Sequence, residues 1–352
     1  MDGLRTIAIA LVIASHGVDG FVRTAGITVG ETQLFVFRSF GIKGVTLFFS
    51  ISGFLITHLL IREQQANGMI SLSSFYMRRM LRIFPAFYFY LLAVVTFATI
   101  VGRPIRPSNI ALAGTFLNDY RIFFHVASST SDLDGFLGHT WSLATEEQFY
   151  LVWPIVFVVW GLSRAKWVAG ILILLMPLVR VLCYFLVPSG RAAMAFEAHD
   201  NLDRLMCGCL LALLSGDQRF EAVMRKFQSA IWPSICVAWI FLVQPVLEFR
   251  FGGTYSLVFG ISIESLMWAF LIGWLIRNAD SMAAAFLNLR PVAFIGSLSY
   301  SLYLWQQPFT QEANSTVTGR FPINLLCIIA AACFSYFVIE RPFNVLRSRF
   351  RR

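Results

Sequence analysis

The sequence is poor in charged residues, which make up 13% of its 352 positions, about half the share of an average soluble domain. Apolar residues make up 57%, and phenylalanine alone occurs 35 times. This composition excludes an ordinary soluble domain and indicates a polytopic membrane protein. The formal charge of +9 comes from basic residues in short loops, where they are typical of membrane orientation and not of nucleic-acid binding.

Other features are also missing. The first apolar run has no small-residue cleavage site and carries Arg5 and His16, so we expect a true span and not a cleaved signal peptide. Since no glycine-rich phosphate loop and no spacing of metal ligands occurs, we expect no bound metal and no permanently bound cofactor. We interpret the six cysteines, which lie mostly in apolar segments, as small residues for helix packing.

A helix needs roughly twenty apolar residues to cross the hydrocarbon, and this criterion predicts about ten spans. Because backbone groups in lipid must be satisfied internally, we expect an all-α fold. The predicted spans are 4–21, 45–61, 84–101, 143–160, 167–187, 202–214, 231–247, 255–276, 292–309 and 323–339.

Lysine and arginine residues are distributed unevenly between the alternate loops. With the N-terminus inside, seventeen lie on the cytoplasmic side and ten outside, which predicts that both termini are cytoplasmic. We treat 1–352 as a single membrane domain without a separate soluble domain. The longest connection, 102–140, lies outside in this topology and can shape a substrate site.

Arg5 and His16 are unusual because ionisable side chains inside a span are costly and mostly have a function. They are eleven residues apart, so on a helix both lie on one face, roughly 16 Å from each other along the axis. Taken alone, His16 fits a hydrogen-bonded packing residue. Its alignment with Arg5, and the glutamates described next, favour a general base.

Glu146 and Glu147 open the apolar stretch that begins near Trp141. If Trp141 lies at the outer surface, the glutamates lie about one turn inside, at a depth similar to that of His16. A carboxylate there can fix the imidazole tautomer. Because neighbouring side chains on a helix diverge by about 100°, we expect one of the two to do so, with a slight preference for Glu147. Alternatively, both are hydrated in the interfacial zone.

Arg79 and Arg82 precede the third span and are i,i+3 neighbours, so their guanidinium groups can converge on one anion. Planar guanidinium forks suit phosphates. The same spacing fits a positive-inside anchor equally well.

Two further spans carry informative side chains. Ser50, Ser52 and Gly53 are small and predict close packing of the second span against another helix. The ninth span brings Tyr300 to mid-depth and Gln306 to the depth of His16, so these polar side chains can line the same cavity. An aromatic belt with helix caps is the alternative interpretation of this span.

The chain resembles the integral-membrane acyltransferase family 3 over nearly its whole length. Six elements in the right order carry the resemblance: Asp2-Gly-Leu-Arg5 with His16; Ser52-Gly-Phe-Leu-Ile56; Arg79-x-x-Arg82 before Ile83 and Pro85; Trp141-Ser-Leu with Glu146-Glu-Gln-Phe-Tyr150; Ser299-Tyr300 with Tyr303-Leu-Trp305; and Glu340-Arg-Pro342. The position after Trp305 is often histidine in the family and is Gln306 here, which argues against proton transfer by this residue.

The resemblance implies an O-acyltransferase that moves an acyl group, most often acetyl, from cytosolic acyl-CoA to a hydroxyl of a glycan or small molecule. His16 is then the general base or the acyl carrier, and a continuous cavity should connect it to Arg82. The other predicted site residues are Glu146 and Glu147 as catalytic partners, Arg5, Arg79 and Arg82 for the donor, and Trp141, Tyr150, Tyr300 and Gln306 for substrate.

Two other classes of function fit the same residues. A proton-coupled secondary transporter also uses buried histidine, arginine and glutamate, but no repeated half of the chain supports it. A lipid-binding scaffold would need no covalent chemistry. We expect acyl-CoA, a hydroxyl acceptor and the lipid bilayer as partners, a bacterial inner membrane as the location, and no hydrolase-like domain of the type that many family members add.

Overall fold

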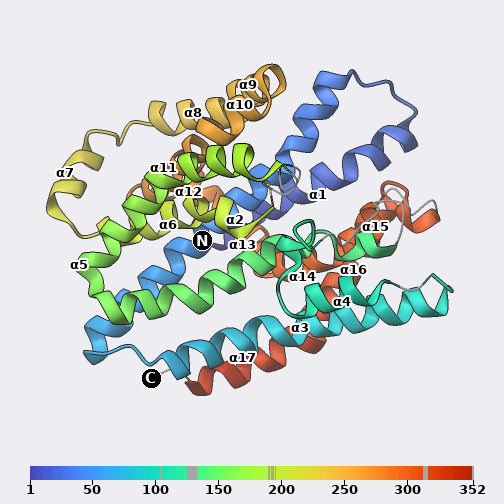
Figure 1. Ribbon diagram of the computed structural model, residues 1–352, viewed down its shortest axis with the longest axis horizontal. Coiled ribbons are helices and arrows are strands. Elements are labelled where there is room, and N and C mark those ends of the chain that lie inside the picture. Colours follow the sequence, from blue (N-terminus) through green and yellow to red (C-terminus); the bar gives the residue numbers. More distant parts are fainter. Residues whose placement is uncertain are drawn as a thin grey trace.

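The computed structural model describes residues 1–103, 105–124, 133–188, 191, 194, 196–311 and 316–350. Helices make up nearly all of the regular structure in these ranges, and no strand occurs in them (Figure 1). This confirms the predicted all-α fold. The middle of the long connection, 125–132, lies outside the described residues.

The N-terminal half contains four long helices joined by short elements. Their bounds are α1 (Asp2–Ala25), α2 (Glu31–Asn67), α3 (Leu72–Ile100), α4 (Pro107–Gly114), η1 (Asn118–Tyr120), η2 (Leu133–Leu137) and α5 (Thr140–Leu186). α5 contains two predicted spans, and Figure 1 shows two arms that meet at a bend. The bend is at Gly161, whose φ of 71° lies in a region that glycine enters at little cost because it has no Cβ.

The C-terminal half is more fragmented. Its helices are η4 (Ala198–Asp200), α6 (Leu202–Leu214), α7 (Gln218–Arg225), α8 (Ile231–Ala238), η5 (Trp239–Val243), α9 (Gln244–Phe251), α10 (Gly253–Tyr255), η6 (Ser256–Gly260), α11 (Ile261–Arg277), α12 (Met282–Leu287), α13 (Arg290–Ser297), α14 (Ser299–Trp305), α15 (Gln307–Thr310), η7 (Val317–Gly319), α16 (Ile323–Phe334), η8 (Ser335–Glu340), α17 (Arg341–Arg347) and η9 (Ser348–Phe350). The helical run from α16 to α17 lies beside α3 (Figure 1).

Seven segments of the described chain are long and apolar enough to cross a membrane, and the protein is an integral membrane protein. They are Asp2–Val22, Glu31–Asn67, Leu72–Ile100, Gly135–Leu186, Ile231–Phe251, Gly253–Arg277 and Ile323–Arg347. The fourth segment contains two of the ten predicted spans. The predicted sixth span is only the 13-residue α6, and the ninth is divided into α13, α14 and α15. The number of spans and the position of the termini stay predictions.

α2 and α6 cross at very short distance. A Cβ at Gly53 would lie 2.0 Å from the Leu205 carbonyl oxygen, and one at Gly208 would lie 2.0 Å from the Ser50 carbonyl oxygen. Only glycine fits at these two positions. The close packing predicted for this part of α2 is therefore confirmed, although Ser52 has a different environment.

Candidate active site

A cavity of about 640 Å³ lies among α1, α2, α3, α5 and α14. Its volume is in the usual range for a small-molecule or cofactor site. Both apolar side chains, among them Val45 and Phe48, and several basic side chains line it. Of the ten predicted site residues, six line this cavity: Arg5, Arg79, Arg82, Glu146, Tyr150 and Tyr300.

Three arginines on two helices give the cavity a cationic wall. Arg5 of α1 donates to Asp2 Oδ1 at 3.0 Å. The Arg79 guanidinium lies over the ring of Tyr150, with 5.2 Å between its carbon and the ring centroid. In the described ranges, no carboxylate lies within ion-pair distance of Arg79 or Arg82. Cationic groups without matching carboxylates favour an anionic ligand.

Glu146 belongs to this cavity and not to the surroundings of His16. Its Oε1 accepts a hydrogen bond from Ser52 Oγ at 2.6 Å, and Ser52 Oγ accepts one from the Tyr150 hydroxyl at 3.1 Å. Glu147 does not line the cavity, and its buried Oε1 has no hydrogen-bond partner in the described part of the chain. A direct hydrogen bond from Glu146 or Glu147 to His16 is therefore not formed in the described ranges, while a contact through one water stays a prediction.

The first residues of α5 are covered by other parts of the protein. We placed Trp141 at the outer surface, but Leu137, His139 and Trp141 are all buried. Asn118 fixes this segment by donating to the Leu137 carbonyl oxygen at 2.8 Å. The helix begins at Thr140, close to the predicted entry near Trp141, so the prediction missed the packing around its first turn and not its position in the sequence.

His16 has two acceptors at the same ring nitrogen. Its Nδ1 lies 3.0 Å from the Val12 carbonyl oxygen and 3.2 Å from Gln306 Oε1. Since a carbonyl and an amide oxygen can only accept, Nδ1 carries the proton and Nε2 holds the lone pair. The neutral imidazole therefore has the tautomer in which Nε2 can take a proton or attack a carbonyl carbon.

The cavity described above does not reach His16 in the described part of the chain, because neither His16 nor Gln306 lines it. Tyr303, which does line it, is one helical turn before Gln306. The Tyr303 hydroxyl donates to the His139 carbonyl oxygen at 2.6 Å and lies 2.6 Å from Ser142 Oγ. The cavity thus ends about one turn before Gln306, whose side chain contacts the imidazole.

Trp141 and Tyr300 have different environments, although we predicted substrate contacts for both. Tyr300 lines the cavity and donates to the Ile83 carbonyl oxygen at 2.9 Å, which ties α14 to α3. Trp141 does not line it: the ring packs against Phe49 and Phe196, with centroids 6.2 and 5.3 Å away. Its large apolar surface holds α5 against α2.

Sequence reasoning missed Ser52 and His139. Ser52 was interpreted as a packing residue, yet it holds Glu146. His139 is 4% exposed, and neither ring nitrogen has a hydrogen-bond partner in the described part of the chain. The ring centroid lies 5.2 Å from that of Tyr303. The available signal was the position of His139 two residues before Trp141-Ser-Leu, inside the stretch that carries the glutamates.

The 102–140 connection is fixed to α5 next to the glutamates. Gln148 Nε2 donates to both oxygens of Asp119 at 3.0 Å and to the Phe116 carbonyl oxygen at 3.0 Å. Burial raises the pKa of Asp119 to about 6, against the opposing effect of the Gln148 hydrogen bond. The 102–140 connection therefore positions α5 at Gln148, directly after Glu147.

Comparisons with known proteins agree with the resemblance. A family model described as "Acyltransferase domain" (family 3) matches residues 1–341. O-acetyltransferase OatA of Staphylococcus aureus strain NCTC 8325 is 30% identical to this chain; the match covers 97% of this chain and 56% of the relative. The protein of the same name from strain COL has the same identity and coverage. This chain thus spans about half the length of these relatives. No solved structure matches it significantly. With the six sequence elements and a match over residues 1–341, the chain belongs to the integral-membrane acyltransferase family 3.

Proposed function

We propose that this protein is a membrane O-acetyltransferase that takes an acetyl group from cytosolic acyl-CoA and transfers it to a hydroxyl. The proposal rests on family membership and on one observation above all: a cationic cavity of about 640 Å³ that three arginines share with a serine-bound glutamate. The acetyl group follows from the printed name of the S. aureus relatives. Family membership favours this function over a proton-coupled transporter.

Arg79 and Arg82 bind the phosphates of acyl-CoA in this proposal, and Arg5 of α1 adds positive charge to the same cavity. Both α3 arginines lack a carboxylate partner in the described ranges, so their guanidinium groups are available to an anion. The ring of Tyr150 holds Arg79 in place without neutralising it. The apolar walls at Val45 and Phe48 suit the uncharged arm of the donor.

His16 acts as general base on the acceptor hydroxyl, or carries the acetyl group for a short time. Its Nε2 lone pair is the reactive position because Nδ1 is held by Val12 and Gln306. In direct transfer, the hydroxyl proton moves to Nε2, the oxygen attacks the thioester carbonyl carbon and the CoA thiolate leaves. The acceptor is a hydroxyl of a cell-envelope glycan or a small molecule, and the membrane is the bacterial inner membrane.

Donor binding can be measured on the purified full chain in lipid nanodiscs, titrated with acetyl-CoA. Losing one charge-assisted contact costs about 1.5–3 kcal/mol, so Arg79→Ala and Arg82→Ala should each raise the Kd about 10- to 100-fold. Lysine at either position should restore only part of the affinity, because it lacks the planar fork. Arg219→Ala is the matched control, since Arg219 is exposed on α7 away from the cavity. Unchanged affinity in both alanine variants would refute donor binding by these arginines.

Turnover is followed as CoA thiol release when extracted envelope glycan is added as acceptor. Loss of a general base costs about 10²- to 10⁴-fold, so His16→Ala should lower turnover by that factor while acetyl-CoA still binds. Wild-type turnover in this variant would remove His16 from the mechanism. Proton-driven solute uptake into liposomes without any thiol release would instead support the transporter.

A further inference from the structure

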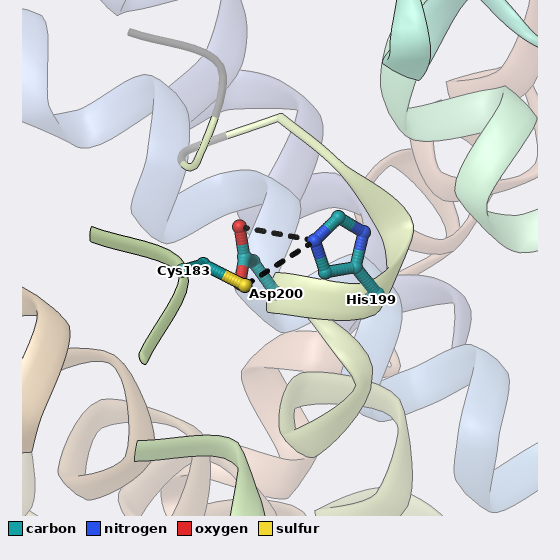
Figure 2. A group of neighbouring side chains, drawn as sticks. All are labelled: Cys183, His199 and Asp200. Carbon is teal, nitrogen blue, oxygen red and sulfur yellow. Dashed lines mark hydrogen bonds and ion pairs between the residues drawn. The ribbon is translucent and has the colours of Figure 1, made fainter. Parts of the chain in front are cut away.

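Three side chains that can bind a metal meet near the end of the second arm of α5. Cys183 lies one turn before the end of this helix, while His199 and Asp200 belong to η4 (Figure 2). His199 Nε2 lies 3.9 Å from Cys183 Sγ and 3.8 Å from Asp200 Oδ2. All three donor atoms lie within 4.8 Å of one another. Figure 2 shows the sulfur and the carboxylate directed at the same imidazole nitrogen.

A fourth donor lies at the same nitrogen. Glu197 Oε2 is 3.6 Å from His199 Nε2, and the Glu197 side chain is buried. In a tetrahedral zinc site, bonds of about 2.0–2.3 Å separate neighbouring donor atoms by about 3.3–3.8 Å. The three distances from His199 Nε2 equal or nearly equal these separations. Cys183, His199 and Asp200 also lie within 4.8 Å of one another, so these three are placed to share one ion, and the Glu197 side chain would have to move toward the other two to complete the site.

The Asp200 carboxylate lacks the hydrogen bonds that a buried anion needs. Asp200 is 0% exposed, and neither of its side-chain oxygens has a hydrogen-bond partner in the described ranges. Arg180 is close, but it pairs with Asp203 and donates through Nε to the backbone oxygen of Asp200. Arg204 is the other neighbouring cation and lies beyond ion-pair distance. A buried carboxylate without these hydrogen bonds is costly, and a bound cation would offset this cost.

The imidazole is held from its opposite side by the 102–140 connection. The Tyr120 hydroxyl lies 3.4 Å from His199 Nδ1, and the two rings stack with centroids 5.8 Å apart. A partner at Nδ1 orients the ring and leaves Nε2 for the cluster, the arrangement common in histidines that bind metals. Metal binding would thus tie the end of α5, η4 and the 102–140 connection together.

We propose that Cys183, His199 and Asp200, with Glu197 as fourth ligand, bind a zinc ion. One sulfur, one nitrogen and carboxylate oxygens form a donor set that suits Zn²⁺. Cys183 binds as the thiolate and releases its proton to solvent. The sequence predicted no bound metal. It could not reveal this site, because the ligands are a single cysteine and a distant Glu-x-His-Asp segment, which do not have the spacing of a known metal motif. By fixing the segment before α6, the ion stabilises the folded state.

The test uses the full chain in nanodiscs, loaded with ZnCl₂, freed of loose metal and analysed by mass spectrometry for bound zinc. The wild type should retain one zinc per chain, and zinc should raise its Tm. Cys183→Ser, His199→Ala and Asp200→Asn should each weaken zinc binding by at least about tenfold. Cys236→Ser is the control, because Cys236 is a half-buried cysteine on α8 outside the cluster, and it should retain the ion.

Cobalt substitution gives a readout that needs no variant. Co²⁺ bound to the wild type should show the near-ultraviolet absorption of a cobalt–thiolate bond, and equimolar Zn²⁺ should remove it. A wild type that retains no zinc and gives no such absorption would overturn the proposal. The same holds if zinc leaves its Tm unchanged, since His199 would then only contact the two carboxylates. Equal zinc retention in the three ligand variants would also overturn it.

Discussion

Replacing Gly53 by alanine tests the packing that holds one wall of the candidate active site. Gly53 faces the α6 backbone, and its neighbour Ser52 donates to Glu146 in the cavity. An added Cβ would lie 2.0 Å from the Leu205 carbonyl oxygen, whereas real Cβ atoms essentially never come closer than 3.0 Å. Backbone atoms cannot rotate away, so α2 and α6 must separate by about 1 Å at this point.

The size of the effect follows from this shift. Overpacking of a well-packed interior costs about 1–3 kcal/mol. The entropy of unfolding is about 2.1 cal/mol/K per residue, so a chain of 352 residues loses about 1.4 °C in Tm for each kcal/mol. Gly53→Ala should therefore lower the Tm by about 1–4 °C. A shift of about 1 Å at Gly53 also moves Ser52 relative to Glu146. In the wild type, Ser52 Oγ donates a hydrogen bond to Glu146 Oε1 at 2.6 Å. We therefore expect a rise in KM for acetyl-CoA in the variant that still folds.

The assay compares thermal unfolding and acetyl-CoA kinetics of purified protein with those of Gly170→Ala. Gly170 is a helical glycine of α5, and a Cβ there would meet nothing within 4 Å, so alanine should raise or preserve stability. A Gly53→Ala protein with the Tm and KM of the wild type would refute the close α2–α6 crossing.

Three further predictions concern single side chains. Burial raises the pKa of Asp119 from 3.8 to about 6, so the free energy of unfolding of the wild type should fall as the pH rises between these values. Asp119→Asn should remove this pH dependence in unfolding curves recorded from pH 4 to pH 7. Asp203→Ala leaves Arg180 buried without its partner and should cost about 3–5 kcal/mol in unfolding free energy, whereas Arg180→Leu with Asp203→Leu should recover part of it. Gln306→Leu removes one acceptor from His16 and should lower kcat about 3- to 10-fold at unchanged Tm, measured as CoA thiol release.

Composition and span length predicted the class of fold because they depend only on what lipid tolerates. Few charges and long apolar runs leave helices as the only elements that satisfy the backbone. The same criterion could not resolve the ninth span, where α14 ends at Trp305 and the chain continues into α15. Nor could it show that the 137–141 segment is buried, because burial there depends on Asn118 of the long connection, far from it in sequence.

The arginine part of the candidate site was predictable, and the glutamate part was not. Arg79 and Arg82 lie one turn apart, so helix geometry alone places both on one wall. The start of α5 at Thr140 agrees with the predicted entry near Trp141. The surroundings of Glu146 depend instead on how α5 packs against α2, where Ser52 donates to its carboxylate, and no spacing in the sequence gives that packing.

The distance between the cavity and His16 limits how transfer can occur. A general base must come within about 3 Å of the proton that it takes, directly or through one water. Tyr303 lines the cavity one turn before Gln306, and its hydroxyl is held at 2.6 Å by both Ser142 and the His139 carbonyl oxygen. If acyl-CoA binds in this cavity as we propose, Tyr303 lies between the cavity and Gln306, which contacts the imidazole. The proposed transfer therefore requires the Tyr303 side chain to leave at least one of these hydrogen bonds when the acceptor binds.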